Sequence, residues 1–135
     1  MRNTIILSGF LIAVLFTNAS FTHSSSKSEL AKIMRRMLDY IKKEKVLIEE
    51  NKHRQPYPYF IQKMTTAKIT EGKKLSVDHS EYSTQFLTGL DKYYKDTDDN
   101  KRKETFNTVV NACVTCHKRE CPGPVQTIQQ NLLKP

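Results

Sequence analysis

The feature that most constrains this chain is the pentapeptide Cys113-Val114-Thr115-Cys116-His117, near its C-terminal end. Two thiols three residues apart, followed directly by an imidazole, are typical of covalent attachment of a c-type haem. On a helix, Cys113, Cys116 and His117 project from one face. The two sulfurs can then form thioethers to the porphyrin vinyl groups while the imidazole ligates the iron. This haem motif therefore predicts one haem c per chain.

Three other uses of the paired cysteines fit less well. A structural zinc site needs a second pair of ligands, and Cys121, His53 and His79 do not form one at suitable spacing. A thioredoxin-like redox pair would sit beside a βαβ pattern, and the sequence shows no alternation of strands and helices. A disulfide between cysteines three residues apart would close a very tight loop, which helical geometry resists. Haem attachment is the preferred interpretation.

Residues 1–19 predict a cleaved signal peptide. Arg2 supplies a positive start, residues 5–16 form an apolar run of the expected length, and small residues up to Ala19 offer a cleavage site. The apolar run is too short to cross a bilayer comfortably. Export to the periplasm agrees with the haem motif, because c-type haem is attached outside the cytoplasm.

The remaining chain, residues 20–135, predicts a single domain. Its length of about 115 residues is enough for one core. Residues 20–28 are polar and predict a disordered start, and residues 122–135 form a C-terminal tail beyond the motif. The formal net charge of the whole chain is +8, and the basic residues are scattered. A solvated basic surface is expected, not a nucleic-acid groove, with steering toward an acidic redox partner as the functional alternative.

Apolar residues recur at helical spacing in four stretches. A capping box of Ser26 and Glu29 opens the first predicted helix, which covers about 23 residues from Leu30. The other three helices are expected from Pro58 through Ile69, from about 78 to 95, and from about 100 to 119, with a short helical turn after Pro122-Gly123-Pro124. No strand pattern interrupts them. The sequence therefore predicts an all-α fold, an antiparallel four-helix bundle with the haem motif on the last helix.

A haem motif on the last helix of a four-helix bundle, behind an export signal, resembles the cytochrome c′ family. The more usual small cytochromes c carry this motif near the mature N-terminus. A second similarity is Ile33-Met34-Arg35-Arg36-Met37 on the first helix. It is similar to the place where the low-spin, methionine-ligated members of the family carry their distal iron ligand.

The resemblance implies a role for each of these residues. Cys113 and Cys116 would carry the thioethers, and His117 would be the proximal iron ligand. Met34 is the expected distal ligand, with Met37 on the same helix as the alternative. A methionine at helical spacing is otherwise core filler. The apolar residues expected to line the haem pocket are Leu30, Met37, Ile41, Phe86, Leu90 and Phe106.

Two functions are compatible with this resemblance. If Met34 closes the sixth position, the iron has His and Met ligands, which raise the reduction potential and suit electron transfer. If neither methionine reaches the iron, the five-coordinate site would bind nitric oxide or another small diatomic gas. No catalytic acid, base or nucleophile is indicated, so no enzyme is predicted. A haem-free helical module is a third reading, and a homodimer, common in this family, stays open.

The chain departs from the family after the motif, where family members often end. Cys121 lies four residues beyond His117 and has no partner once two cysteines are bound to haem. Intermolecular pairing, a free thiol and burial beside the haem are all open. Burial as a small apolar side chain is preferred.

Overall fold

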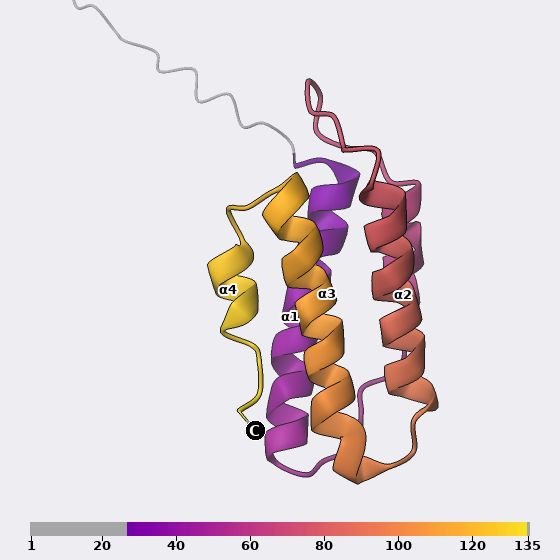
Figure 1. Ribbon diagram of the computed structural model, residues 1–135, viewed down its shortest axis with the longest axis vertical. Coiled ribbons are helices and arrows are strands. Elements are labelled where there is room, and N and C mark those ends of the chain that lie inside the picture. The colour runs from indigo at the N-terminus through magenta and orange to yellow at the C-terminus, as the bar shows by residue number, and fades with distance from the viewer. Residues whose placement is uncertain (1–26, 135) are drawn as a thin grey trace, which may run out of the picture.

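The computed structural model describes residues 27–134, so the predicted signal peptide and Ser26 lie outside the described residues. Within this range the protein is all helical, and no strand is present (Figure 1). In chain order the elements are α1 (Glu29–Glu49), the 3₁₀ helix η1 (Tyr59–Thr65), α2 (His79–Lys95), the 3₁₀ turn η2 (Asp99–Lys101), α3 (Arg102–Glu120) and the short α4 (Val125–Gln129).

The three long helices, α1, α2 and α3, lie side by side, and α4 lies on the flank of the molecule (Figure 1). α2 and α3 are joined through η2, run in opposite directions and pack closely against each other. α3 also contacts α1 and α4, whereas η1 contacts α1 and α2. The N-terminal half of α1 and the C-terminal half of α3 therefore lie at the same end of the molecule.

α1 confirms the first predicted helix, with a different cap. The Oγ of Ser28 accepts a hydrogen bond from the backbone N of Ala31 at 3.2 Å, which satisfies one of the free donors of the first turn. The helix ends just before Asn51, whose φ of 52° is in the left-handed region. Its buried positions follow the helical period and are Ile33, Met37, Tyr40, Ile41, Glu44 and Ile48.

The second predicted helix is shorter than expected. It is a seven-residue 3₁₀ helix, Tyr59–Thr65, and the chain after Thr65 leaves helical geometry before Ile69. Its buried residues are Ile61 and Met64, and Pro58, directly before its first residue, is buried as well. Their spacing of three matches the three residues per turn of a 3₁₀ helix. Four full-length helices are therefore not present among residues 27–134.

The third and fourth predicted helices are confirmed as α2 and α3. Phe86, Leu90 and Tyr93 form the buried apolar stripe of α2. The side chain of Asp98 accepts a hydrogen bond from the backbone N of Asn100 at 2.9 Å, which caps the turn leading into α3.

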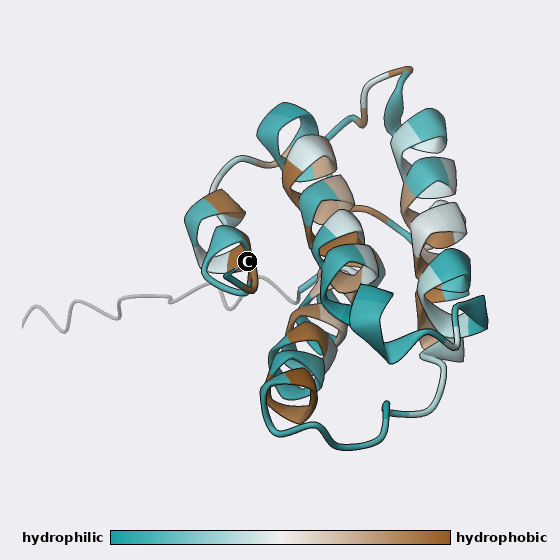
Figure 2. Cartoon of the chain, turned by 60° about the horizontal axis from the view of Figure 1, so that its bottom comes forward, coloured by the Kyte–Doolittle hydropathy of each residue, from teal (hydrophilic) through white to brown (hydrophobic). Residues whose placement is uncertain are grey.

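The apolar faces of the helices meet in one core, and their polar faces point outward (Figure 2). Of the residues expected to line a haem pocket, Met37, Ile41, Phe86, Leu90 and Phe106 are buried there, and Leu30 packs against the edge. No helix within residues 27–134 is long and apolar enough to cross a membrane.

The tail beyond the haem motif folds back along α3. Asn107 on α3 holds it with two hydrogen bonds to Leu133: Nδ2 donates to the carbonyl O at 2.9 Å, and Oδ1 accepts from the backbone N at 2.8 Å. Lys45 on α1 donates to the carbonyl O of Gln130 at 3.0 Å. Ile128 and Leu133 are buried, so the tail is an integral part of the core.

Candidate haem-binding site

The haem motif lies in the last two turns of α3. Cys116 is buried, and Cys113 and His117 are half-buried. Cys113 packs against the core that contains Phe106 and Val110, the residues one to two turns earlier on the same face. The motif therefore faces the other helices at one end of the molecule.

Both thiols of the motif are held in the protonated form. None of the three cysteines forms a disulfide. Burial, reinforced by the neighbouring Cys116 thiol, raises the pKa of Cys113 to about 12. Burial and the nearby Glu120 carboxylate raise the pKa of Cys116 to about 11. Reactive redox cysteines have lowered pKa values, so this environment disfavours the thioredoxin-like alternative.

His117 is oriented by a hydrogen bond within α3. Its Nδ1 lies 2.9 Å from the carbonyl O of Cys113, one turn earlier. A carbonyl oxygen only accepts, so Nδ1 carries the proton and Nε2 keeps its lone pair. Burial lowers the pKa of His117, although the same hydrogen bond partly opposes this. The side chain is therefore neutral at pH 7. Its Nε2 can bind a metal through the lone pair, and its Nδ1 is held by the backbone hydrogen bond.

The two candidate distal methionines differ in environment. Met37 is 3% exposed and belongs to the core, whereas Met34 is half-buried and packs against the core edge. Both lie in the N-terminal half of α1, at the same end of the molecule as the motif (Figure 1). Met34 can turn toward a ligand without leaving a void in the core, and Met37 cannot.

The donor set fits a haem better than a bare metal ion. Within residues 27–134, no three side chains of His, Cys, Asp or Glu converge in a metal-binding arrangement. A c-type haem does not require such convergence, because the cysteine sulfurs bond to vinyl carbons and the iron takes only axial donors. His117 and one methionine supply the two donor types that this coordination needs.

Polar contacts tie the start of α2 to the end of α3 beside the motif. Glu120 accepts hydrogen bonds from the hydroxyl and the backbone N of Ser76, the latter at 2.9 Å. Burial alone would raise the pKa of Glu120, but the two hydrogen bonds outweigh it and lower the pKa. His79 has its Nε2 3.3 Å from the Oγ of the buried Ser83. The buried Nδ1 of His79 has no hydrogen-bond partner among the described residues.

Cys121 corrects one expectation. It follows the last residue of α3 and is exposed, so its burial beside a haem is wrong. An exposed thiol leaves intermolecular pairing and a free thiol as the remaining interpretations.

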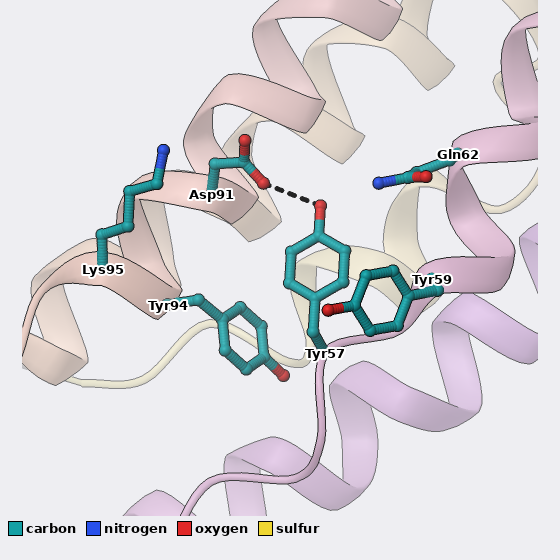
Figure 3. Close-up of a pocket in the computed structure, with 6 residues that line it drawn as sticks. All are labelled: Tyr57, Tyr59, Gln62, Asp91, Tyr94 and Lys95. Atoms are coloured by element: carbon teal, nitrogen blue, oxygen red, sulfur yellow. Dashed lines mark hydrogen bonds between the residues drawn. The ribbon is translucent and has the colours of Figure 1, made fainter.

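A tyrosine-lined hollow lies away from the motif, between η1, the chain before it and the second half of α2 (Figure 3). It has a volume of about 340 Å³ and is lined by Tyr57, Tyr59, Gln62, Asp91, Tyr94 and Lys95. The hydroxyl of Tyr57 donates to Oδ1 of Asp91 at 2.8 Å. No local pattern in the sequence groups these residues.

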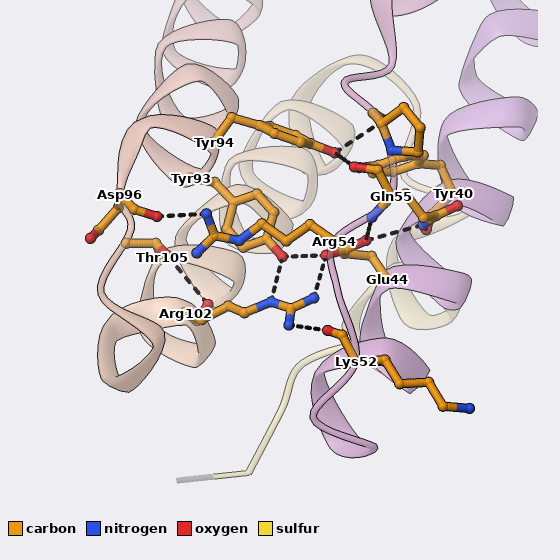
Figure 4. Close-up of polar contacts among 11 residues, drawn as sticks. Tyr40, Glu44, Lys52, Arg54, Gln55, Tyr93, Tyr94, Asp96, Arg102 and Thr105 are labelled. Carbon is orange, nitrogen blue, oxygen red and sulfur yellow. Dashed lines mark hydrogen bonds and ion pairs between the residues drawn. The ribbon is translucent and has the colours of Figure 1, made fainter.

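A buried polar network joins the other ends of the three long helices (Figure 4). Arg102 donates from Nη2 to Oε1 of Glu44 at 2.9 Å and from Nε to the hydroxyl of Tyr93 at 3.2 Å. Tyr93 in turn donates its hydroxyl proton to Glu44. The other carboxylate oxygen of Glu44 accepts from the backbone N of Gln55 at 3.0 Å. Glu44, Arg102 and Tyr93 are all buried.

A sequence signal for this network exists. Glu44 occupies a position on the buried stripe of α1, three residues after Ile41 and four before Ile48. Arg102 similarly precedes the buried Phe106 by one turn. A charged residue at an apolar position of a stripe indicates a buried, paired charge, although it does not identify the partner.

Comparisons with known proteins give no relative to place beside this chain. No family model, no curated protein and no solved structure matches it.

Proposed function

We propose that this chain is an exported c-type cytochrome that carries one covalent haem and transfers electrons in the periplasm. The observation that carries this proposal is the geometry of the haem motif. Two cysteines and a histidine lie on the inward side of α3. The hydrogen bond from Nδ1 of His117 to the carbonyl O of Cys113 leaves Nε2 with a lone pair that can bind iron. The resemblance to the cytochrome c′ family supports the same assignment.

The side chains of the motif divide the work. Cys113 and Cys116 fix the macrocycle at two points along one face of α3, and His117 is the proximal iron ligand. The bound haem supplies the one-electron couple of its iron. Burial keeps the imidazole neutral, and the backbone hydrogen bond to Nδ1 limits its rotation, so the side chain would need little reorganisation when the charge of the site changes.

Met34 is the proposed distal ligand, with Met37 as the alternative. The partial burial of Met34 at the core edge supports this order, because Met37 already fills a position in the core. If haem is bound, a methionine thioether together with His117 would favour the reduced state. Such a ligand pair would suit electron transfer and would leave no vacant position for a substrate at the iron.

Gas binding is the alternative function. The N-terminal half of α1 presents mainly apolar side chains, Ile33 and Met37 among them, at the motif end of the molecule. If neither methionine ligates, these side chains would form an apolar wall over an open iron site. A small diatomic such as nitric oxide would then be the ligand.

A visible absorption spectrum of the purified mature protein separates the two functions. Electron transfer predicts sharp low-spin bands in the reduced state that do not respond to carbon monoxide. A high-spin spectrum that shifts with carbon monoxide would replace electron transfer by gas binding.

A haem stain on a denaturing gel tests the attachment itself. After co-expression with the haem-attachment machinery, the band should stain, and the Cys113→Ala, Cys116→Ala double variant should not. Lack of stain in the unchanged protein would end the cytochrome proposal and favour a haem-free helical module.

A redox partner with an acidic docking surface is part of the proposal. It rests on the basic excess of the exported chain, which without residues 1–19 loses only Arg2 and keeps a formal net charge of 21 − 14 = +7, and this charge would accelerate association with an opposite charge. The association rate with such a partner should fall steeply as salt is added. A rate that is independent of salt would remove this part of the proposal.

A further inference from the structure

The tyrosine-lined hollow has the composition of a small-ligand site, and it lies apart from the haem motif. Asp91, Tyr94 and Lys95 belong to the second half of α2, which packs beside the first half of the oppositely directed α3 (Figure 1). The motif occupies the other half of α3. Whatever this hollow binds is therefore not the haem.

Aromatic surface dominates the hollow. The ring of Tyr57 lies between those of Tyr59 and Tyr94, with centroid distances of 4.8 and 5.0 Å and interplanar angles of 53° and 61°. Tyr59 is 72% exposed, whereas the rings of Phe86, Tyr93 and Phe106 are buried in the core. The three rings are inclined to one another (Figure 3), and the exposed ring of Tyr59 is the one that a flat molecule can contact from solvent.

The polar groups around the platform include both donors and acceptors. Asp91 uses Oδ1 to accept from Tyr57, which leaves Oδ2 available. The amide of Gln62 and the ammonium group of Lys95 complete the lining. One carboxylate and one ammonium balance each other, so the hollow carries no net charge from its lining residues.

This lining disfavours a charged ligand of either sign. A cation over the exposed ring of Tyr59 would be repelled by the ammonium group of Lys95, which lines the same hollow. An anion would meet Asp91. A neutral ligand with flat apolar faces and many hydroxyl groups suits both the platform and its rim, because the slightly positive axial C–H groups of a sugar ring are attracted to the negative faces of aromatic rings.

We propose that the tyrosine-lined hollow binds a neutral saccharide, with the ring of Tyr59 stacking on a sugar and Asp91 and Gln62 pairing with its hydroxyl groups. A volume of about 340 Å³ accommodates one or two sugar rings and lies at the lower end of the range for small-molecule sites. So open a site binds weakly, with an expected Kd of about 1 mM. The proposal does not rest on haem attachment.

The test uses saturation-transfer NMR with the purified protein, whether or not it carries haem, and cellobiose, a neutral disaccharide with two flat rings. Transfer to the axial sugar protons is expected, with saturation in the millimolar range. Tyr59→Ala should weaken binding about tenfold or more, whereas Tyr59→Phe should retain it because the ring remains. Lys63→Ala, an exposed change on η1 outside the hollow, is the matched control and should have no effect.

Three results would overturn the proposal. They are no transfer at 20-fold above the expected Kd, equal binding by the protein and its Tyr59→Ala variant, and displacement of cellobiose by an equal concentration of tetramethylammonium, which would indicate a cation site. Because haem staining and visible spectra are measured separately, failure of this test leaves the cytochrome proposal standing, and the reverse also holds.

Discussion

Arg102 and Glu44, 58 residues apart in the chain, form a buried ion pair in which Nη2 lies 2.9 Å from Oε1. The two side chains are 8% and 1% exposed. Tyr93 contacts both partners, and the backbone of Lys52 accepts a further hydrogen bond from Arg102 at 2.5 Å. The pair therefore holds the start of α3, the end of α1 and the chain that follows α1 in one arrangement.

Removal of one partner of this pair should destabilise the protein strongly. Arg102→Met leaves the carboxylate of Glu44 buried without its counter-charge, and a loss of about 3–5 kcal/mol in the free energy of unfolding is expected. Urea unfolding followed by circular dichroism measures it. The matched control is Lys52→Met, because Lys52 and Glu50 form an exposed pair at 2.7 Å, worth about 0–1 kcal/mol. Equal losses in the two variants would show that burial does not matter here.

Alanine variants of the two candidate distal methionines should differ in their stability and in their visible spectra. Met37→Ala removes a core side chain and should cost about 2–5 kcal/mol of stability, with the visible spectrum unchanged. Met34→Ala should convert low-spin iron to high-spin iron, with a smaller loss of stability. The reverse pattern would make Met37 the ligand. His117→Ala should abolish normal iron ligation in either case.

The contact between Ser76 and Glu120 should make stability depend on pH. The hydrogen bonds lower the pKa of Glu120 in the folded protein below its unfolded value, so the unfolded state binds the proton more readily. The stabilisation is present above the unfolded pKa of about 4.3 and is lost as the pH falls through the folded pKa. Glu120→Gln should therefore reduce stability at pH 7 and converge with the unchanged protein toward pH 3. Glu71→Gln, an exposed loop change, should leave the profile unaltered; convergence in that variant as well would deny a special role for Glu120.

The C-terminal tail should loosen when its anchor is removed. Asn107→Ala deletes both hydrogen bonds to Leu133 and leaves two backbone groups without partners, at a cost of about 1–3 kcal/mol. Hydrogen exchange should accelerate in residues 125–134 more than in α2. Asn111→Ala, an exposed change one turn further along α3, is the control. Unchanged exchange in the tail of Asn107→Ala would mean that the packing of Ile128 and Leu133 and the hydrogen bond from Lys45 hold the tail without Asn107.

The three long helices were predicted from the sequence because each depends only on the local spacing of its apolar residues. The stripes of α1, α2 and α3 repeat every three to four residues, and their bounds in the structure lie within a few residues of the expected ones. The length of the second helix was overestimated, because the spacing of three between Ile61 and Met64 fits the first turn of an α-helix as well as a 3₁₀ helix. The preceding buried Pro58 extends the spacing of three and is the signal that favours the shorter element.

Interactions between distant segments could not be read from the sequence. The pairing of Glu44 with Arg102 depends on how three helices pack, and no local pattern encodes that choice. The hollow around Tyr57 and Tyr94 likewise combines residues 37 positions apart. Cys113, Cys116 and His117 could be predicted as a haem site because covalent haem attachment requires fixed local spacing, whereas a distal ligand on another helix carries no such constraint.

The high pKa values of the two motif thiols bear on the order of events in the maturation of this protein. A thiol with a pKa near 11 or 12 is almost entirely protonated at pH 7 and is a poor nucleophile. Under the proposed function, we therefore expect the thioethers to form before α3 packs into the core. The tail that folds back on Asn107 would then dock last, completing the core around a group already bonded to the chain.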